Sequence, residues 1–285
     1  MDIRDTGRLA RSLEALHSMT YFAPETEESL TAAGLQPGRM SYFAGRSAPM
    51  GAVGAGVVTA TFYNFSPTLV ARSIPAAWEL ASPSALVQAR FAAVDAALRR
   101  MLGDTVVASP EVAEAAGLAR RAAEACSVDG RPLAAAHLDV AWPAEPHLVL
   151  WHGLSVLREH RGDGHVAMLL DAGLSGLEAL VCHTASGRGF VPEFARRSRG
   201  WSTEQWDAAT AGLVERGVLD ADGGLTDDGT ALRRGIEDDT TRLGAGPWLH
   251  LGDEGAARLG DLGGVLVRAL VAAGCFPDGV FAGAR

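Results

Sequence analysis

Residues 157–170, LREHRGDGHVAMLL, decide how the rest of the chain is interpreted, because they place a dense polar cluster among apolar helical sequence. The residues just before this stretch, LVLWHGLSV, and its own end, VAMLL, are typical of buried helices. Charged side chains in such surroundings need partners, since burial of an unpaired charge is costly. We therefore expect ligand binding or chemistry here. The ionisable side chains of the stretch are those of Arg158, Glu159, His160, Arg161, Asp163 and His165.

The glycines of the stretch predict a turn between two helices. Residues 147–160 have the apolar spacing of a helix, and the RGDG run is expected to end it. Asp163 is then placed to cap a second helix, over residues 165–172, by accepting hydrogen bonds from its first N–H groups. Such a turn would fold the imidazoles of His160 and His165 toward each other.

The sequence after the stretch predicts helices and strands in the order found in a winged helix. An Ala-Gly-Leu turn at residues 172–174 and a helix to about His183 are followed by a capping box at Ser202 and a helix to Arg216. The run RGVLDADGGLTDDG then predicts a strand, a tight turn, a second strand and the start of a long helix. We expect a small β-hairpin wing at this place.

The composition predicts a mainly α protein. The 285 residues are 48% hydrophobic and 21% charged, Ala-rich and Leu-rich segments dominate, and β-branched runs are few. A chain of this length accommodates two units, both of which we expect to be helix-turn-helix-like or winged-helix-like. The predicted segments are an N-terminal helical unit at residues 1–104, a helical linker at 105–144, a degenerate winged-helix unit at 145–246 and a helical tail at 247–285.

A weak internal repeat links the two halves. TAAGLQPGRMSYFAGR, residues 31–46, resembles LDAGLSGLEALVCHTASGR, residues 170–188, and their Ala-Gly-Leu turns are 139 residues apart. Such turns are also common in Ala-rich chains, so a true duplication and a coincidence both stay open. If the duplication is real, the two units would pack as a pseudo-dimer with their polar connections converging on one pocket.

Charge and cysteine content limit the partners and the compartment. The formal net charge of −9 and the pI of about 5.4 disfavour nucleic acid and anionic membranes as partners. The three cysteines are far apart and lack CxxC spacing, so we expect reduced thiols in the cytoplasm. No stretch approaches about 18 uninterrupted apolar residues, and the N-terminus lacks a signal-peptide core, so we expect no membrane segment.

The predicted winged helix lacks the basic side chains that DNA recognition requires. A recognition helix and its wing need Arg or Lys to reach phosphates and base edges. Here the helix from Ser202 has three acids against Arg216, and the wing has four Asp residues and no base. DNA binding is therefore disfavoured, although a cluster just before the helix could still touch backbone phosphate. This cluster consists of Arg196, Arg197 and Arg199.

Six motifs together resemble a known family. YFAPE, YFAGRSAPMG, TFYNFSP, LREHRGDGHVA, RGWS and RGVLDADGGLT, which span nearly the whole chain, look like an actinobacterial helix-turn-helix domain-containing family of uncharacterised function. This resemblance implies the architecture and brings no catalytic role with it. Residues 216–232 are also similar to the helix, wing and helix of MarR-like regulators, which would imply DNA binding, but the wing arginines of those regulators are missing here.

The spacing of His152 and Glu159 places them on one helix face. They are seven residues apart, so they lie within about 20° of each other around the helix axis. They could share a proton or a metal ion, and His160 and His165 would extend the set to one that suits zinc, iron or nickel. The spacing matches no recognised metal motif, so the metal stays unknown. In an enzyme these four residues would be the catalytic acids and bases.

The arginines of the stretch offer a site for an anion. Arg158 and Arg161 provide guanidinium forks close to the expected helix N-terminus at His165. Together with the free N–H groups of that helix start they would suit a carboxylate or phosphate of a small molecule. Asp163 is a further ligand-binding candidate of the stretch. The alternative is purely structural, with Asp163 as a helix cap and Arg161 paired with Glu159.

The N-terminal half supplies further ligand-binding candidates. His17, Tyr21 and Glu25 recur at four-residue spacing and would form one polar stripe on a continuous helix, although a proline interrupts it. Arg46 and Asn64 are polar residues set among aromatic ones. We expect these five side chains to face the polar stretch across a groove between the two units.

The sequence favours a small-molecule-binding protein or an enzyme, built on a winged-helix scaffold that has lost DNA binding, with an anionic or polar ligand. A MarR-like transcriptional regulator is the alternative, and a sensor without catalysis is a third candidate. The cofactor stays unknown, because P-loop, Rossmann, α/β-hydrolase and CxxC motifs are absent. A homodimer stays open.

Overall fold

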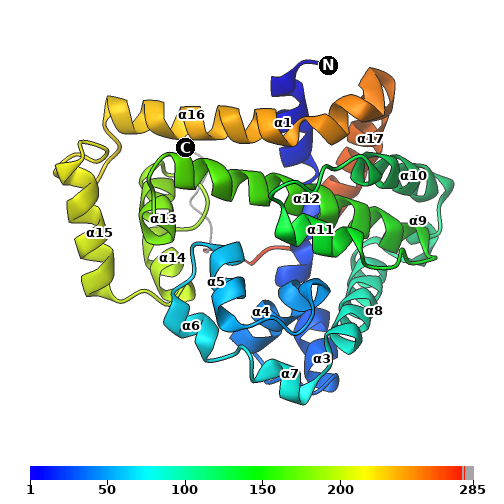
Figure 1. Cartoon of the computed structure of the whole chain (residues 1–285). Helices are drawn as coiled ribbons and strands as arrows, with labels where there is room; N and C mark the ends of the chain where they lie inside the picture. The colour runs from blue at the N-terminus through cyan, green and yellow to red at the C-terminus, as the bar shows by residue number, and fades with distance from the viewer. Residues whose placement is uncertain (278, 280–285) are drawn as a thin grey trace. The chain divides into compact units, whose positions relative to one another are not determined.

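The computed structural model describes residues 1–277 and residue 279, and it confirms a mainly α fold (Figure 1). The chain divides into two compact units, each assembled from segments that are far apart in sequence. Unit 1 contains Met1–Val53, Ser73–Gly164 and Thr241–Phe276. Unit 2 contains Gly54–Arg72 and His165–Thr240, with the described residues that follow Phe276.

The helices of each unit are as follows. Unit 1 contains α1 (Ile3–Ser12), α2 (Glu14–Ser18), η1 (Met19–Tyr21), α3 (Pro24–Ala32), α4 (Arg39–Ser47), η2 (Ala48–Met50), α7 (Ala77–Leu80), α8 (Pro83–Leu102), α9 (Asp104–Val107), α10 (Pro110–Glu124), α11 (Pro132–Leu138) and α17 (Gly246–Ala272). Unit 2 contains α5 (Ala55–Phe62), α6 (Pro67–Ala71), α13 (Gly176–Ala185), α14 (Pro192–Ser198) and α15 (Thr203–Glu215). The boundaries between the units fall inside α12 (Pro146–Asp171) and α16 (Asp227–Gly244).

Several helices begin where local capping signals predict. At the start of α15, Ser202 accepts a hydrogen bond from the N–H of Gln205 at 3.1 Å and donates its own N–H to the Gln205 side chain, which confirms the predicted capping box. Ser175 forms the same arrangement with Glu178 at the start of α13. Ser82 caps α8 by accepting a hydrogen bond from the N–H of Ala85. These starts depend only on residues within one turn of the cap, so the sequence reveals them.

The helix break predicted at the RGDG run is wrong, because α12 continues through it. Gly164 lies against Arg131, whose Nη1 atom is 2.7 Å from the place that a Cβ atom of Gly164 would occupy. At Gly162 such an atom would meet only Oε2 of Glu159, at 3.6 Å. Gly164 therefore allows Arg131, which precedes α11, to lie close to α12. Neither glycine forms a turn.

Asp163 caps a different helix from the one predicted. Its Oδ2 atom accepts hydrogen bonds from the backbone N–H groups of Leu133 and Ala134, at 3.0 and 2.9 Å, in the first turn of α11. N–H groups at a helix start have no partner inside their own helix, so a carboxylate from within α12 stabilises the start of α11. Burial raises the pKa of Asp163 to about 6, while these N–H donors act to lower it.

The predicted β-hairpin wing is also wrong. Between α15 and α16 the described chain makes a tight turn with one isolated antiparallel bridge, between Leu219 and Leu225, and it forms no strand. Asp220 closes this turn, because its Oδ1 atom accepts from the N–H groups of Asp222 and Gly224 at 2.9 and 2.8 Å. Asp side chains that bond to nearby backbone compete with sheet pairing, which explains why the strand-like pattern did not produce strands.

The core of unit 1 joins helices from both ends of the chain. α17 packs against α1, α2, α8 and α10, and Leu259 and Leu266 of α17 share one apolar cluster with Leu13. Gly263 lies directly against Leu13, so only a glycine allows these helices to approach so closely. Because the C-terminal helix returns to the N-terminal ones, unit 1 cuts across the four consecutive segments predicted. The end of the predicted tail, residues 278 and 280–285, lies outside the described residues.

The core of unit 2 lies among α13, α14 and α15, where α13 packs against the other two. Cys182 and Leu213 are fully buried there. The chain after α5 approaches the start of α13 so closely that a Cβ atom on Gly176 would overlap the carbonyl group of Tyr63. The hydroxyl of Tyr63 also donates a hydrogen bond to the carbonyl of Leu174. These contacts join residues 54–72 to the rest of unit 2.

The two Ala-Gly-Leu turns have the same local geometry. In the first, between α3 and α4, the N–H of Leu35 donates to the carbonyl of Leu30 at 3.1 Å. In the second, between α12 and α13, Leu174 donates to Leu169 at 3.0 Å. Both are helix ends of the Schellman type with a glycine in the left-handed region. The angle of 99° between α12 and α13 suits a helix-turn-helix, whereas duplication of whole units stays a prediction.

No single helix among the described residues is long and apolar enough to cross a bilayer. Among the described helices, the bent pair of α12 and α13 has the length and apolar composition of a membrane span only when the two helices are counted together. Many apolar side chains of this pair, such as Leu150, Trp151 and Leu180, are buried inside the protein.

Candidate functional site

An ion pair between α4 and α12 lies at the centre of the candidate site. Glu159 is 1% exposed and accepts two hydrogen bonds from Arg46, at 2.9 Å from Nε and 2.7 Å from Nη2. Arg158 donates a third from Nη1 at 2.8 Å, and its Nε atom lies 3.7 Å from a carboxylate oxygen of Glu14. Burial alone would raise the pKa of Glu159, but the guanidinium groups of Arg158 and Arg46 lower it well below its usual range.

The charged side chains of Arg46, Arg158 and Glu159 therefore have their partners inside unit 1. A carboxylate whose pKa is lowered is a weak base, so Glu159 is better suited to holding Arg46 and Arg158 than to accepting a proton from a substrate. The structural alternative paired Glu159 with Arg161; the observed partners are Arg46 and Arg158. Arg46 is 113 residues away in sequence, which is why no local spacing revealed it.

A chain of hydrogen bonds leads from Tyr21 into the core through His17. The Nε2 atom of His17 is 3.0 Å from the hydroxyl of Tyr21, as the four-residue spacing predicted. Its Nδ1 atom is 2.8 Å from the hydroxyl of Ser155, which donates to the carbonyl of Trp151 at 2.7 Å. The ring of His17 is 1% exposed and stacks on that of Trp151, with centroids 6.2 Å apart. Burial, with Arg158 nearby, lowers the pKa of His17 well below its usual range.

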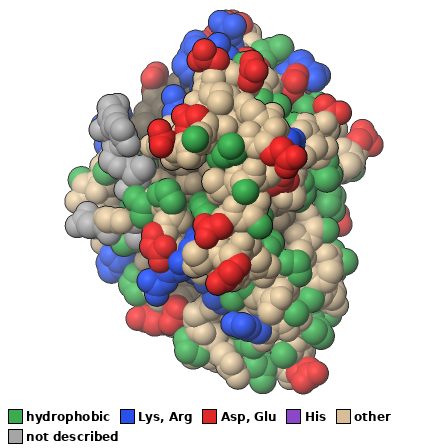
Figure 2. All heavy atoms as spheres, turned by 90° about the vertical axis from the view of Figure 1, so that its left-hand side faces the viewer, with side chains coloured by type: hydrophobic (Ala, Val, Ile, Leu, Met, Phe, Trp, Pro, Cys, Tyr) green, Lys and Arg blue, Asp and Glu red, His purple; other side chains and the backbone are tan. Residues whose placement is uncertain are grey.

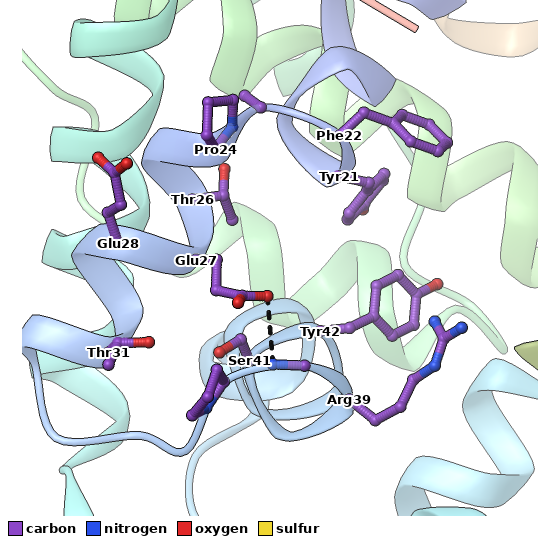
Figure 3. A pocket seen from close by; sticks show the side chains of 13 residues that line it. Tyr21, Phe22, Pro24, Thr26, Glu27, Glu28, Thr31, Arg39, Ser41 and Tyr42 are labelled. Atoms are coloured by element: carbon purple, nitrogen blue, oxygen red, sulfur yellow. Dashed lines mark hydrogen bonds between the residues drawn. The ribbon is translucent and has the colours of Figure 1, made fainter. Parts of the chain in front are cut away.

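A groove of about 880 Å³ lies between α3 and the start of α4 (Figure 3). Figure 3 shows the lining side chains of α3 and α4 together with Tyr21 and Phe22, which precede α3. Glu27 accepts a hydrogen bond from the N–H of Gly38 at 3.2 Å. Its lining combines aromatic, hydroxyl and charged groups, which include Tyr21, Phe22, Thr26, Glu28, Arg39 and Tyr42. Such a mixture suits a small organic ligand with a few polar groups.

Tyr21 and Tyr42 connect this groove to the buried polar groups. Their rings are neighbours, with centroids 5.4 Å apart and planes at 57°. Tyr21 contacts His17, and the hydroxyl of Tyr42 accepts a hydrogen bond from Nη1 of Arg46 at 3.3 Å. A ligand in the groove would therefore lie one side chain away from both His17 and the Arg46–Glu159 pair.

A second group of buried polar side chains comes from α8, α11 and α12. Arg90 is 5% exposed, and its guanidinium lies 5.2 Å from the ring centroid of Trp151. Burial lowers the pKa of His137 to about 4 and that of His152 to about 3. Nη2 of Arg90 and Nε2 of both histidines have no hydrogen-bond partner among the described residues. A buried polar atom without a partner is uncommon in proteins.

His152 and Glu159 share a helix face but do not interact. Seven residues along a helix correspond to about 10 Å of rise, which is too far for a shared proton or metal ion. The ring of His152 lies instead against those of Trp142 and Phe91, with centroids 4.8 and 5.6 Å away. Within the described part of the chain, no group of three or more His, Cys, Asp or Glu side chains is arranged to hold a metal ion.

The expectation that His160 and His165 face each other is wrong, because they are five residues apart on a continuous helix and about 140° apart around its axis. His160 is buried in unit 1, where burial and the nearby Arg131 lower its pKa to about 4. His165 belongs to unit 2 and contacts the hydroxyl of Thr240 at 2.9 Å. Since no helix starts at His165, the predicted anion site at a free helix N-terminus is wrong too. Arg161 packs against the backbone at Gly244.

Two other predicted ligand-binding residues are not among those that line the groove. Glu25 forms an ion pair with Arg100 of α8, with 3.1 Å between Nη2 and Oε2. The polar stripe stops at Tyr21 because Pro24 begins a new helix there. Asn64 belongs to unit 2, where its backbone carbonyl accepts a hydrogen bond from the indole of Trp201 at 2.9 Å.

Several residues of the site were not predicted from the sequence. Tyr42 precedes Arg46 by four residues, and Ser155 follows Trp151 by four, so helical spacing could have linked each pair. Arg90 and His137 have no such local signal, because each is placed by the packing of α8 or α11 in unit 1. Long-range contacts of this kind leave no periodic trace in a single sequence.

The described surface of α15 and the following turn is acidic, as predicted. Arg216 pairs with Glu178 at 2.9 Å, and Arg196 pairs with Glu193 at 3.1 Å. Arg199 lies over the rings of Phe65 and Phe190. On the face drawn in Figure 2, acidic side chains and arginines are scattered, and no continuous basic stripe is visible among the described residues. This surface lacks the charge that typical DNA-binding helices present.

A family model described as a helix-turn-helix family matches residues 6–277, which is most of the chain. No curated protein and no solved structure matches it significantly. The match to this family therefore includes residues of both compact units.

Proposed function

Since the chain belongs to the helix-turn-helix family whose model matches residues 6–277, we propose that it uses this scaffold to bind a small polar molecule rather than to read DNA. The ligand site is the groove between α3 and α4. The observation that carries the proposal is the link from this groove, through Tyr21 and Tyr42, to the buried polar side chains of His17 and Arg46.

The energetics of burial support a functional role for these polar groups. Replacing a buried ion pair by well-packed apolar residues is often neutral or stabilising, so stability alone does not favour Arg46 and Glu159 in this core. Unit 1 already has an extensive apolar cluster built on α8, α10, α12 and α17. Buried titratable groups next to an open groove are, in contrast, typical of ligand sites.

Blocking the groove tests the proposal. Thr31 lines the groove on α3, and its exposed neighbour Ala32 does not line it. We expect Thr31→Trp to abolish binding of small molecules that stabilise the wild-type protein, and the matched control Ala32→Trp to retain it. A fragment library of aromatic and polar compounds, screened by thermal shift and confirmed by native mass spectrometry, provides the measurement. Hits that bind both variants equally would place ligand binding elsewhere and refute the proposal.

A MarR-like regulator is the second candidate, as the resemblance of residues 216–232 implies. The helix-turn-helix angle of 99° between α12 and α13 and the helical order α13, α14, α15 favour it. The acidic surface of α15 opposes it, because like charge repels DNA phosphates. Electrophoretic mobility shift at low salt with fragments of the source genome separates the two candidates. Sequence-specific retardation that is lost in Arg197→Ala would support the regulator.

A further inference from the structure

The donor role of Ser155 sets the direction of the hydrogen bonds behind the groove. Ser155 has a single hydroxyl proton, and it donates this proton to the carbonyl of Trp151 at 2.7 Å. Towards His17, 2.8 Å away, Ser155 can therefore only accept. With Ser155 donating to Trp151, the Nδ1 atom of His17 is the donor of that hydrogen bond and carries a proton.

The state of His17 then determines the role of Tyr21. The imidazole is buried, contacts hydroxyl groups at both nitrogens and has no carboxylate partner among the described residues. Burial, with Arg158 nearby, lowers its pKa well below the usual range, so the ring is neutral. With its one proton on Nδ1, the ring has a lone pair at Nε2. The hydroxyl of Tyr21, 3.0 Å from Nε2, must donate its proton there.

This donation leaves the hydroxyl oxygen of Tyr21, a residue that lines the groove, as a hydrogen-bond acceptor. Burial raises the pKa of Tyr21 to about 12, so the hydroxyl stays protonated at neutral pH. Its proton is directed to His17, and only the oxygen lone pairs remain for a ligand. A ligand that places a donor there completes the hydrogen bonding of Tyr21, whereas a ligand that presents an acceptor is repelled.

The charges around the groove favour an uncharged ligand. Arg46 and Arg158, which would attract an anion, are already paired with Glu159. The groove itself has charges of both signs, because Glu27 and Glu28 line it together with Arg39. The remaining lining includes the aromatic rings of Tyr21, Phe22 and Tyr42, which suit a flat ring.

We propose that the groove binds an uncharged aromatic molecule that bears a hydroxyl group, and that Tyr21, oriented by His17 and Ser155, selects this hydroxyl as a hydrogen-bond acceptor. The inference rests on the proposed function, since it names the ligand class of the same groove. Tyr21 is the specificity-determining residue, and His17 and Ser155 are positioning residues.

Three probes of similar size test the inference: phenol, anisole and benzoate. Phenol can donate to Tyr21, anisole is its methyl ether and cannot, and benzoate is an anion. In a ligand-observed NMR titration of the full chain, we expect phenol to bind about tenfold more tightly than anisole, as loss of one hydrogen bond predicts. We expect benzoate to bind more weakly than phenol.

The variant Tyr21→Phe links this preference to one hydroxyl. It removes the acceptor and keeps the ring, so we expect it to bind phenol and anisole equally. The control Tyr63→Phe, in unit 2, removes a hydroxyl that donates to the carbonyl of Leu174, and we expect the tenfold preference to persist. Circular dichroism and melting temperature verify that both variants are folded. Persistence of the preference in Tyr21→Phe overturns the inference.

The outcomes separate this inference from the proposed function. If benzoate or anisole binds the wild-type protein better than phenol, and Thr31→Trp abolishes that binding, the groove is a ligand site and the inferred ligand class is wrong. If none of the three probes binds, the inferred class is also wrong, and the Thr31→Trp screen then decides the proposed function independently.

Discussion

Asp163 accepts a hydrogen bond from the backbone N–H of Ala134 at 2.9 Å, so a residue in the interior of α12 caps the start of α11. Because a helix cap contributes about 1 kcal/mol, we expect Asp163→Ala to lower the free energy of unfolding by roughly 1–2 kcal/mol. Asp163→Asn retains an acceptor oxygen and should cost less. Urea denaturation at neutral pH measures both changes. An alanine variant as stable as the wild-type protein would show that this cap contributes nothing.

The two glycines of the RGDG run should respond in opposite ways. Gly162→Ala adds a Cβ atom that meets nothing closer than 3.6 Å, and alanine is favoured over glycine within a helix, so we expect a gain of about 0.5–1 kcal/mol. Gly164→Ala would place its Cβ atom 2.7 Å from Arg131 and should destabilise the protein. Thermal unfolding of both variants provides the comparison. Destabilisation by Gly162→Ala would contradict a continuous α12.

Removing the charge of Glu159 should be strongly destabilising. Glu159→Gln leaves the guanidinium of Arg46 buried without a counter-charge, and breaking one partner of a buried pair typically costs about 3–5 kcal/mol. The double variant Arg46→Met with Glu159→Gln removes that unpaired cation and should recover part of the loss. Chemical denaturation measures the free energies of unfolding. As a control, Glu114→Gln breaks an exposed pair with Arg258 and should have a much smaller effect.

Acid should destabilise the protein through its buried histidines. The folded-state pKa of His152, about 3, is below its ordinary value of 6.5, so the unfolded chain takes up this proton first as the pH falls. The stabilising contribution of neutral His152 is therefore complete above about pH 6.5 and is lost progressively below it. His137 and His160, each with a pKa of about 4, act in the same direction.

We expect His152→Phe to reduce the loss of stability between pH 7 and pH 5 by roughly 2 kcal/mol. Phenylalanine suits the position because Trp142 and Phe91 already surround the ring. Urea denaturation at both pH values tests this, with the exposed His250→Phe as the control. The same pH dependence in the wild-type protein and in His152→Phe would show that His152 already titrates normally.

The contacts within the candidate site could be predicted only where the two partners are close in sequence. The four-residue spacing of His17 and Tyr21 predicts that the two side chains lie on one face, and the two side chains form a hydrogen bond. Arg46 and Glu159 were both selected, but their mutual pairing was not, because 113 residues separate them. The groove lining beyond Tyr21 was not identified, because it depends on how α3 packs against the start of α4.

The sequence by itself determined the mainly α class and the helix start at Ser202, because a cap satisfies N–H groups that lie within one turn of it. The tertiary structure decided the role of LREHRGDGHVAMLL. The same glycines and aspartate that predict a turn remain helical, because Asp163 satisfies the free N–H groups of α11 and Gly164 allows Arg131 to approach α12. Local rules describe what a residue can do for its own helix, whereas packing determines which neighbouring helix it serves.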